Sequence, residues 1–173
     1  NSIHKNCNLK VATTKLVKVC LCFPDLYDLG ASNLGLEILY HIINNREDAV
    51  CERCYCPDID FEEILRRENI PLSSLESQRP LIEFDIIGFS LQYELCITNV
   101  LNMLNLANIP VVSKERLANY PLIIAGGPVC SNPKPIEEFF DLIVIGEGED
   151  VINEIINTVK SSKFNPESSP GQN

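Results

Sequence analysis

The chain has 173 residues, of which 45% are hydrophobic and 22% charged, and it carries a net charge of -10. This length and composition are typical of one soluble globular domain. The acidic charge disfavours nucleic acid as a partner, because a phosphate backbone would be repelled. No apolar run approaches the roughly 20 residues that span a bilayer. Residues 1–10 also lack a signal-peptide core, so we expect a cytoplasmic protein with no membrane partner.

The eight cysteines predict reduced thiols more than a metal site. Cys20 and Cys22 lie within an apolar run, where a free cysteine behaves as a small hydrophobe. Cys51, Cys54 and Cys56 are the sharper metal candidates, but zinc needs four ligands and no second Cys-x-x-Cys follows. In a strand, Cys54 and Cys56 would share one face while Cys51 points to the other. We therefore predict no metal ligands.

The first half of the chain predicts two strands and two helices. Residues 16–23 form an apolar run without clean alternation, which indicates a central strand covered on both faces. Ser32 is the expected cap of a helix that ends near residue 45. Its apolar row is predicted to be Leu34, Ile38 and Ile42, with Leu39 and Ile43 beside it. A strand over 49–55 and a helix over 60–67 follow, and Pro71 closes that helix.

The second half continues the same alternation of strands and helices. The expected strands cover 85–90, 121–125 and 141–145, and the expected helices cover 94–107, 135–140 and 149–159. This rhythm predicts an α/β fold, a doubly wound, flavodoxin-like sheet of five parallel strands in the order 2-1-3-4-5 with helices on both faces.

The domain is expected to cover residues 15–160, after an N-terminal extension over 1–14. Residues 161–173 are polar and rich in Pro, Gly and Ser, which predicts a disordered tail or linker.

A ligand site in such a fold lies beyond the carboxyl ends of the strands, where the strand order reverses, here between the first and third strands. Glycines at these ends allow a ligand or a docked domain to approach the backbone, although they also end strands in any fold of this kind. The candidate binding residues are those of the loops after the first, third, fourth and fifth strands: Asp25, Tyr27, Gly30, Ser32, Ser90, Leu91, Gln92, Gly126, Gly127, Pro128, Gly146, Glu147 and Gly148.

Several enzyme classes are disfavoured by what these loops contain. Gly30 and Gly35 are too far apart for a dinucleotide-binding glycine motif, and there is no Walker lysine or nucleophile elbow. Acid pairs such as Asp25 and Asp28 lack a partner base or metal, so we interpret them as solvated carboxylates. His41 falls within a helix and is expected on its surface or in its packing. We predict no catalytic residue in this chain.

The rim motifs together resemble a known type of domain. A strand ending in Gly88-x-Ser90, the turn at 126–128 and the Gly-Glu-Gly-Glu segment at 146–149 occur in the order seen in the cobalamin-binding-type domain at the N-terminus of many radical S-adenosylmethionine (radical SAM) proteins. The resemblance covers roughly residues 15–159. It is closer still to one uncharacterised radical SAM family, through the strings at 23–27, 32–36, 74–77 and 84–94.

This resemblance implies an accessory domain next to a catalytic one. The Cys-x-x-x-Cys-x-x-Cys motif of the radical SAM core does not occur here. The iron-sulfur cluster and S-adenosylmethionine are therefore expected only in a downstream catalytic domain, which is the expected partner.

The sequence leaves two alternatives for the cofactor of this domain. Tyr27 occupies the histidine position of an Asp-x-His-x-x-Gly cobalamin loop, and a neutral phenol is a poor cobalt ligand. Cobalamin could thus be held only without histidine ligation, with its nucleotide tail passing Ser90 and Gly126. Alternatively, the rim covers or shapes the active site of the adjoining barrel and no corrinoid binds. We favour the second, because Tyr27, Gln92 and Tyr93 would crowd the corrin.

The alternative function belongs to a different class of protein: a small flavodoxin-like protein that binds a flavin or another ligand. Its phosphate loop would need several Ser or Thr residues after the first strand, and only Ser32 is present. A receiver-type module would need a lysine on the last strand, and residues 143–145 contain none.

Overall fold

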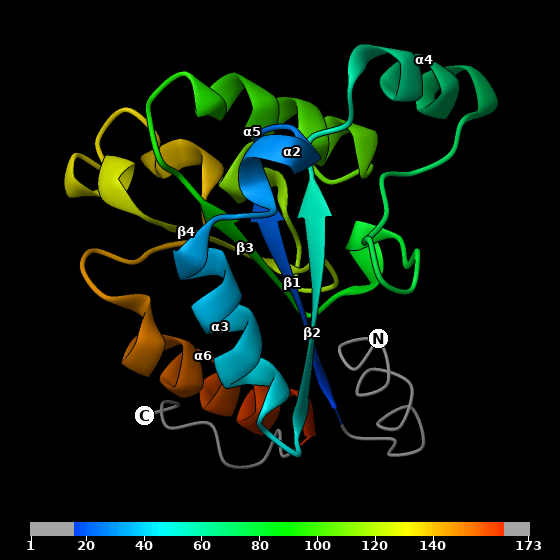
Figure 1. Ribbon diagram of the computed structural model, residues 1–173. Helices are drawn as coiled ribbons and strands as arrows, with labels where there is room; N and C mark the ends of the chain where they lie inside the picture. Colours follow the sequence, from blue (N-terminus) through cyan, green and yellow to red (C-terminus); the bar gives the residue numbers. More distant parts are fainter. Residues whose placement is uncertain (1–15, 165–173) are drawn as a thin grey trace.

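The computed structural model describes residues 16–164, and these contain one parallel sheet between two layers of helices (Figure 1). Each pair of neighbouring strands is parallel. The predicted fold class and strand order are confirmed. The sheet has the order β2-β1-β3-β4-β5, with β1 at Val17–Phe23, β2 at Ala49–Tyr55, β3 at Ile86–Ser90, β4 at Leu122–Gly126 and β5 at Leu142–Ile143.

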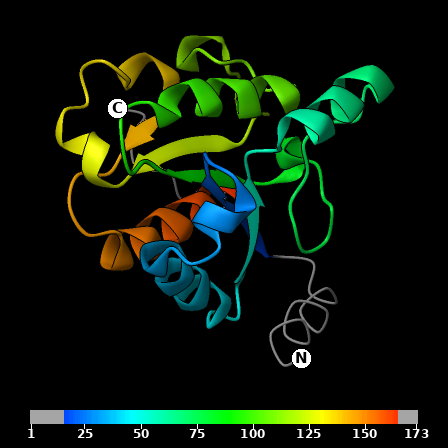
Figure 2. The same cartoon turned by 45° about the horizontal axis from the view of Figure 1, so that its top comes forward.

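The helices divide between the two faces of this sheet. Helices α3 (Leu34–Asn44) and α6 (Gly148–Phe164) lie together on one face, and α5 (Cys96–Leu106) lies on the other with α4 (Ile59–Glu68) beside it (Figure 1 and Figure 2). The short α2 (Tyr27–Gly30) lies over the carboxyl ends of the strands. Within residues 16–164 no helix is long and apolar enough to cross a membrane. Short 3-10 turns complete the connections: η2 (Leu81–Glu83), η3 (Ser113–Glu115), η4 (Pro128–Ser131) and η5 (Glu137–Phe139).

Alternate residues of the central strands feed two separate cores. Ile87 and Phe89 of β3 pack on the α5 side, whereas Ile86 of β3 and Val19 of β1 pack on the α3 and α6 side. Both faces are therefore apolar, which explains why the first strand reads as a continuous hydrophobic run.

Helix α3 differs from its prediction at its cap and along its buried stripe. Asn33, rather than Ser32, is the cap: its Oδ1 accepts a hydrogen bond of 2.9 Å from the Leu36 backbone N–H. The predicted apolar stripe is wrong in part: Leu34 is 72% exposed and Ile38 is also exposed, whereas Ile43 is buried and Leu39 and Ile42 are partly buried. The helix buries a neighbouring stripe, Leu36, Tyr40 and Ile43, because this stripe faces β1 and β2.

The C-terminal helix is longer than predicted. We expected α6 to end at residue 159 and a disordered tail from 161, but the helix continues to Phe164. Lys163 Nζ lies 2.6 Å from Asp85 Oδ1, and Phe164 packs against the α3 and α6 core, so the extra turn has tertiary partners. The expectations for residues 1–14 and 165–173 lie outside the described residues. The helix predicted at 135–140 is only the 3-10 turn η5.

The string at residues 74–77 covers the free edge of β2. The Leu75 N–H donates to the Arg53 carbonyl (2.7 Å), and the Arg53 N–H donates to Glu76 Oε2 (2.7 Å). The buried Glu52 carboxylate accepts hydrogen bonds from the Ser74 and Ser77 hydroxyls. An edge strand covered in this way offers few unpaired backbone groups to another chain.

Candidate functional site

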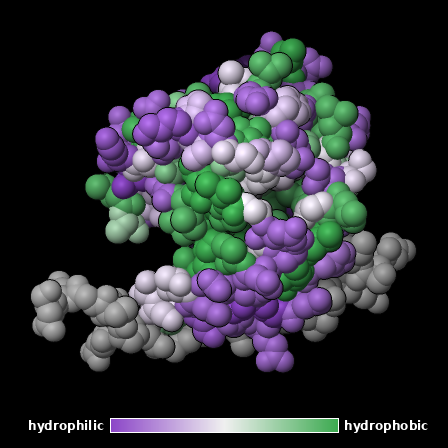
Figure 3. Space-filling view, turned by 90° about the vertical axis from the view of Figure 1, so that its left-hand side faces the viewer, coloured by the Kyte–Doolittle hydropathy of each residue, from purple (hydrophilic) through white to green (hydrophobic). Residues whose placement is uncertain are grey.

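A cavity of about 410 Å³ lies between the sheet and the layer formed by α3 and α6. It lies beside β1 and β3, where the strand order reverses, and includes the carboxyl ends of β3 and β4. Figure 3 shows hydrophobic residues gathered around a hollow on the side of the molecule that is on the left in Figure 1. Its apolar lining comes from β1, β3, β4, α3, α6 and the segment after β5: Val19, Leu21, Ile86, Ile124, Leu36, Leu39, Val144, Val151, Ile152 and Ile155.

Two glycines leave this part of the sheet without side chains. Gly88 lies in the middle of β3, between Leu21 of β1 and Ile124 of β4. Gly126 ends β4, and a Cβ atom built there would meet nothing within 4 Å. A glycine inside a strand commonly marks such a close-approach site. The cavity therefore follows from missing side chains in the sheet as well as from the position of the helices.

The mouth of the cavity is polar and acidic. Gln92 Nε2 donates a hydrogen bond of 2.8 Å to Ser90 Oγ at the end of β3. Glu147 and Glu149 line the cavity next to the start of α6. Among the described residues that line the cavity there is no lysine or arginine. The arrangement combines an aliphatic interior with a negatively charged entrance.

The turn at 126–128 uses its two glycines differently. Gly127 has φ +107°, and a Cβ atom there would lie 2.6 Å from the Leu91 carbonyl oxygen. The Leu91 N–H in turn donates to the Gly126 carbonyl at 2.8 Å. Gly127 thus permits two backbone segments to cross, whereas Gly126 keeps the cavity open. Leu91 is fully buried and Pro128 begins η4, and neither lines the cavity.

The loop after β1 packs as a cap on the rim, away from the cavity lining. Asp25 accepts a hydrogen bond from the Tyr93 hydroxyl, which raises the pKa of Tyr93 to about 12. Tyr27 contacts the Tyr55 ring edge-on, with 5.1 Å between the ring centroids. Gly30 is buried, and a Cβ atom there would lie 2.6 to 2.8 Å from the rings of Phe23 and Tyr55. Ser32 is exposed beside this cap.

The family model for the N-terminal part of radical SAM proteins matches residues 35–170. The chain belongs to this family. The match covers β2 to β5 and both helices that line the cavity, and it begins after the loop that contains Asp25 and Tyr27.

A relative of this radical SAM N-terminal domain occurs in an archaeon. The uncharacterized protein MJ0966 of Methanocaldococcus jannaschii is 28% identical over 149 residues, which are 83% of this chain and 27% of that protein. The chain thus spans about a quarter of the length of this relative. No solved structure matches the chain significantly.

Comparison with the predicted site shows which residues the fold brings together. Seven of the thirteen candidates line the cavity, and Asp25, Tyr27, Gly30, Ser32, Leu91 and Pro128 do not. Sequence reasoning missed the aliphatic interior and Gly88, although a glycine inside a predicted strand was a usable signal. The seven lining candidates are Ser90, Gln92, Gly126, Gly127, Gly146, Glu147 and Gly148.

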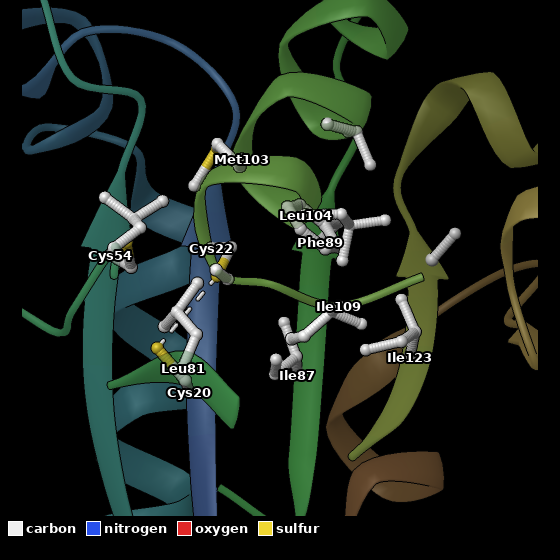
Figure 4. Packing of buried hydrophobic residues seen from close by; sticks show 14 of the residues in the cluster. Cys20, Cys22, Cys54, Leu81, Ile87, Phe89, Met103, Leu104, Ile109 and Ile123 are labelled. Carbon is white, nitrogen blue, oxygen red and sulfur yellow. Dashed lines mark hydrogen bonds between the residues drawn. The ribbon is translucent and has the colours of Figure 1, made fainter. Parts of the chain in front are cut away.

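The cysteines of this domain lie mostly in its cores. Cys20 and Cys22 point to the α5 side of the sheet, 4.0 Å apart at Sγ, with Cys54 nearby on β2 (Figure 4). Burial raises the pKa of Cys20 to about 12 and that of Cys22 well above its usual value. Cys51 lies on the opposite face, as predicted. In residues 16–164 no three His, Cys, Asp or Glu side chains are grouped to hold a metal.

Proposed function

We propose that this domain is a non-catalytic accessory part of a radical SAM protein, and that its rim covers or shapes the active site of the adjoining catalytic domain. Family membership supports the association with a radical SAM catalytic domain. The iron-sulfur cluster and S-adenosylmethionine would then belong to that domain, while this chain supplies one wall around the substrate.

The observation that carries this proposal is an exposed apolar rim around the carboxyl ends of the strands. Leu95 after β3 is 81% exposed, Leu34 at the start of α3 is 72% exposed and Ile145 after β5 is 66% exposed. Leu26, Tyr27 and Leu29 add to the rim from the loop after β1 and from α2. A cluster of this kind on a strongly acidic chain is typical of a surface that another protein layer covers.

The residues near the cavity support a role without chemistry of their own. His41 is 61% exposed on α3, and its Nε2 lies 3.9 Å from Glu37 Oε2. Among the described residues the cavity lining holds no histidine, cysteine or lysine, and the Ser90 hydroxyl at its mouth is hydrogen-bonded to Gln92 rather than to a base. A serine nucleophile needs an adjacent base to activate it.

Hydrogen exchange tests the covering role. We compare the isolated chain with the intact protein that contains its catalytic domain, and we follow backbone amides over residues 26–36, 91–97 and 143–149. Covering should slow their exchange in the intact protein, while the amides of residues 156–163 of α6, at the amino end of the strands, serve as the internal control. Equal exchange of the rim amides in both proteins would contradict the proposal.

A second candidate is cobalamin held in the same cavity without a protein ligand. Tyr27 packs on Tyr55, away from the cavity lining, so ligation from the loop after β1 does not fit. The space beside Gly126 favours this candidate, because a nucleotide tail would need such an approach to the backbone. When bound, cobalamin would supply cobalt chemistry to the neighbouring domain.

Gel filtration with hydroxocobalamin tests this second candidate. Retained colour that disappears in Gly126→Val would support it, and the electron paramagnetic resonance spectrum, recorded after reduction of the bound cobalamin to the cobalt(II) form, should then be free of histidine-nitrogen coordination. A histidine-ligated spectrum, or colour that is retained equally by Gly126→Val, would contradict it.

A further inference from the structure

The cavity beneath the rim has a lining that selects a particular class of ligand. Its interior surfaces are aliphatic side chains from three strands and two helices. Such a surface offers no hydrogen bonds in depth, so it favours a ligand with an aliphatic or ring-shaped apolar body. Its polar groups lie at the mouth, where Ser90, Gln92, Glu147 and Glu149 could contact a single polar end of that ligand.

The charge at the mouth decides which polar end fits. The amino terminus of α6 begins at Gly148 and would by itself attract an anion, with an effect of roughly half a positive charge. Glu147 and Glu149 line the same mouth, and Asp150 lies in the first turn of α6. Two to three full negative charges outweigh that partial positive charge. In the described lining, no arginine or lysine compensates them.

We propose that this cavity binds an apolar small molecule with a cationic or uncharged head group, such as an aliphatic amine, and that it rejects anions. The apolar body would lie against Leu21, Ile124 and Ile155, with its head at Glu147 and Glu149. A phosphate-bearing nucleotide tail, as in cobalamin, is disfavoured by the same charges. This ligand assignment depends on the proposed function in one respect: the covering domain would close over the bound molecule.

Calorimetric titration with three probes of equal chain length tests the charge preference. The probes are octylamine, octanol and octanoate, each titrated into the chain at neutral pH. We expect octylamine to bind about tenfold more tightly than octanoate, because the head-group charge changes sign next to two partly exposed carboxylates. Octanol should fall between them. Equal or tighter binding of octanoate would overturn the proposal, as would no binding of either octylamine or octanol.

Two variants locate the binding and a third serves as a control. Gly126→Val places a side chain in the cavity and should abolish binding of octylamine and octanol. Glu147→Gln with Glu149→Gln should bring octylamine to the affinity of octanol. Asp60→Asn with Glu63→Gln makes the same change in net charge on the exposed side of α4, and should leave all three affinities unchanged. Binding that survives Gly126→Val, or that weakens equally in the control, would place the ligand elsewhere and overturn the proposal.

The failure of this proposal is distinguishable from the failure of the covering role. Absent probe binding together with slowed exchange of the rim amides in the intact protein would overturn only the ligand assignment. Tight octylamine binding without any slowing of rim exchange would overturn only the covering role. Retention of hydroxocobalamin that Gly126→Val abolishes would contradict the rejection of phosphate-bearing ligands.

Discussion

The two faces of the sheet are built from alternate residues of the same strands, yet they are filled differently. On the α5 side, Ile87, Phe89 and Ile123 are buried, and Figure 4 shows Leu104 of α5 against Phe89 and Ile109, which follows α5, beside Ile87 and Ile123. On the α3 and α6 side, the β3 residue in the same region is Gly88, and a cavity of about 410 Å³ lies between the sheet and the helices. Dense packing maximises stability, whereas a hollow in the sheet surface gives up contacts and provides room for a ligand.

Polar contacts hold the α3 and α6 layer at the end that lies away from the cavity. Arg46, which follows α3, donates hydrogen bonds to Asn153 and Asn157 of α6, and Lys160 Nζ lies 2.9 Å from Asp48 Oδ2. These contacts join α6 to the loop before β2, at the amino end of the strands. The fold thus fixes one end of the layer by polar contacts and leaves space at the other end, near the rim.

The largest expected effect is a truncation on the packed face. Phe89→Ala should lower the free energy of unfolding by about 3 to 5 kcal/mol, because Phe89 is only 2% exposed and its removal leaves a cavity. Leu39→Ala on the hollowed face is the matched change, and it should cost roughly 1 to 2 kcal/mol since that side chain is only partly buried. Urea titration measures both. Equal losses would mean that the two faces contribute alike to stability.

The neighbouring glycines of the turn give the next largest contrast. Gly127→Ala should lower stability by roughly 2 to 3 kcal/mol, because the new Cβ would lie 2.6 Å from the Leu91 carbonyl oxygen at a positive φ. Gly126→Ala has nothing within 4 Å of its Cβ, so its stability should change by less than about 1 kcal/mol. Thermal unfolding of the two variants checks this. Comparable losses would show that Gly126 also has a structural role.

Removal of the Tyr55 hydroxyl, on the hollowed face, should have a smaller effect on stability and one of opposite sign. Tyr55 is buried and its hydroxyl has no hydrogen-bond partner among the described residues. Burial also raises its pKa to about 12. Tyr55→Phe should therefore leave stability unchanged or raise it by up to about 1 kcal/mol, because an unsatisfied polar group is removed.

Tyr27 is the other ring of this aromatic pair, so Tyr27→Phe serves as the control for Tyr55→Phe. Tyr27 is 53% exposed, so loss of its hydroxyl should change stability by less than roughly 1 kcal/mol. Denaturant titration of both variants decides the matter. A clear loss of stability in Tyr55→Phe would show that its hydroxyl makes a stabilising contact.

The strand order was predictable because strongly apolar runs alternate with helical patterns and because parallel crossovers are short and right-handed. The buried stripe of α3 could not be predicted from the sequence, because a mostly apolar helix offers several candidate stripes. Tyr40 is selected by its neighbours in three dimensions, among them Arg53, whose guanidinium carbon lies 4.6 Å from the Tyr40 ring centroid.

The candidate site was predictable at its mouth but not in its interior. Strand ends carry visible glycines and polar residues, as at Ser90 and Gly126, so their clustering follows from the topology. The interior depends on the spacing between Gly88 of the sheet and Ile155 of α6, which is a tertiary distance. The cap formed by Tyr27 and Gly30 was assigned to the site because its sequence pattern suggested a cofactor loop. In the structure the Tyr27 ring packs on Tyr55, and Gly30 lies against the rings of Phe23 and Tyr55.

The smallest expected effect concerns pH and the polar contacts that hold α6. Hydrogen bonds from Arg46 and Lys160 lower the pKa of Asp48 from 3.8 to about 2. Because the folded-state pKa is depressed, this carboxylate contributes stability above about pH 4 and loses that contribution as the pH falls toward 2. The group is partly exposed, so its contribution should stay below about 1 kcal/mol.

Asp48→Asn should therefore be slightly less stable than the parent chain at pH 7, and the two stabilities should converge near pH 2. Glu138→Gln, an exposed change of the same type on η5, is the control and should show no such convergence. Urea titrations from pH 7 down to pH 2 measure the difference. A difference that persists at the lowest pH would mean that the Asp48 side chain stabilises the α3 and α6 layer through its shape and neutral hydrogen bonds.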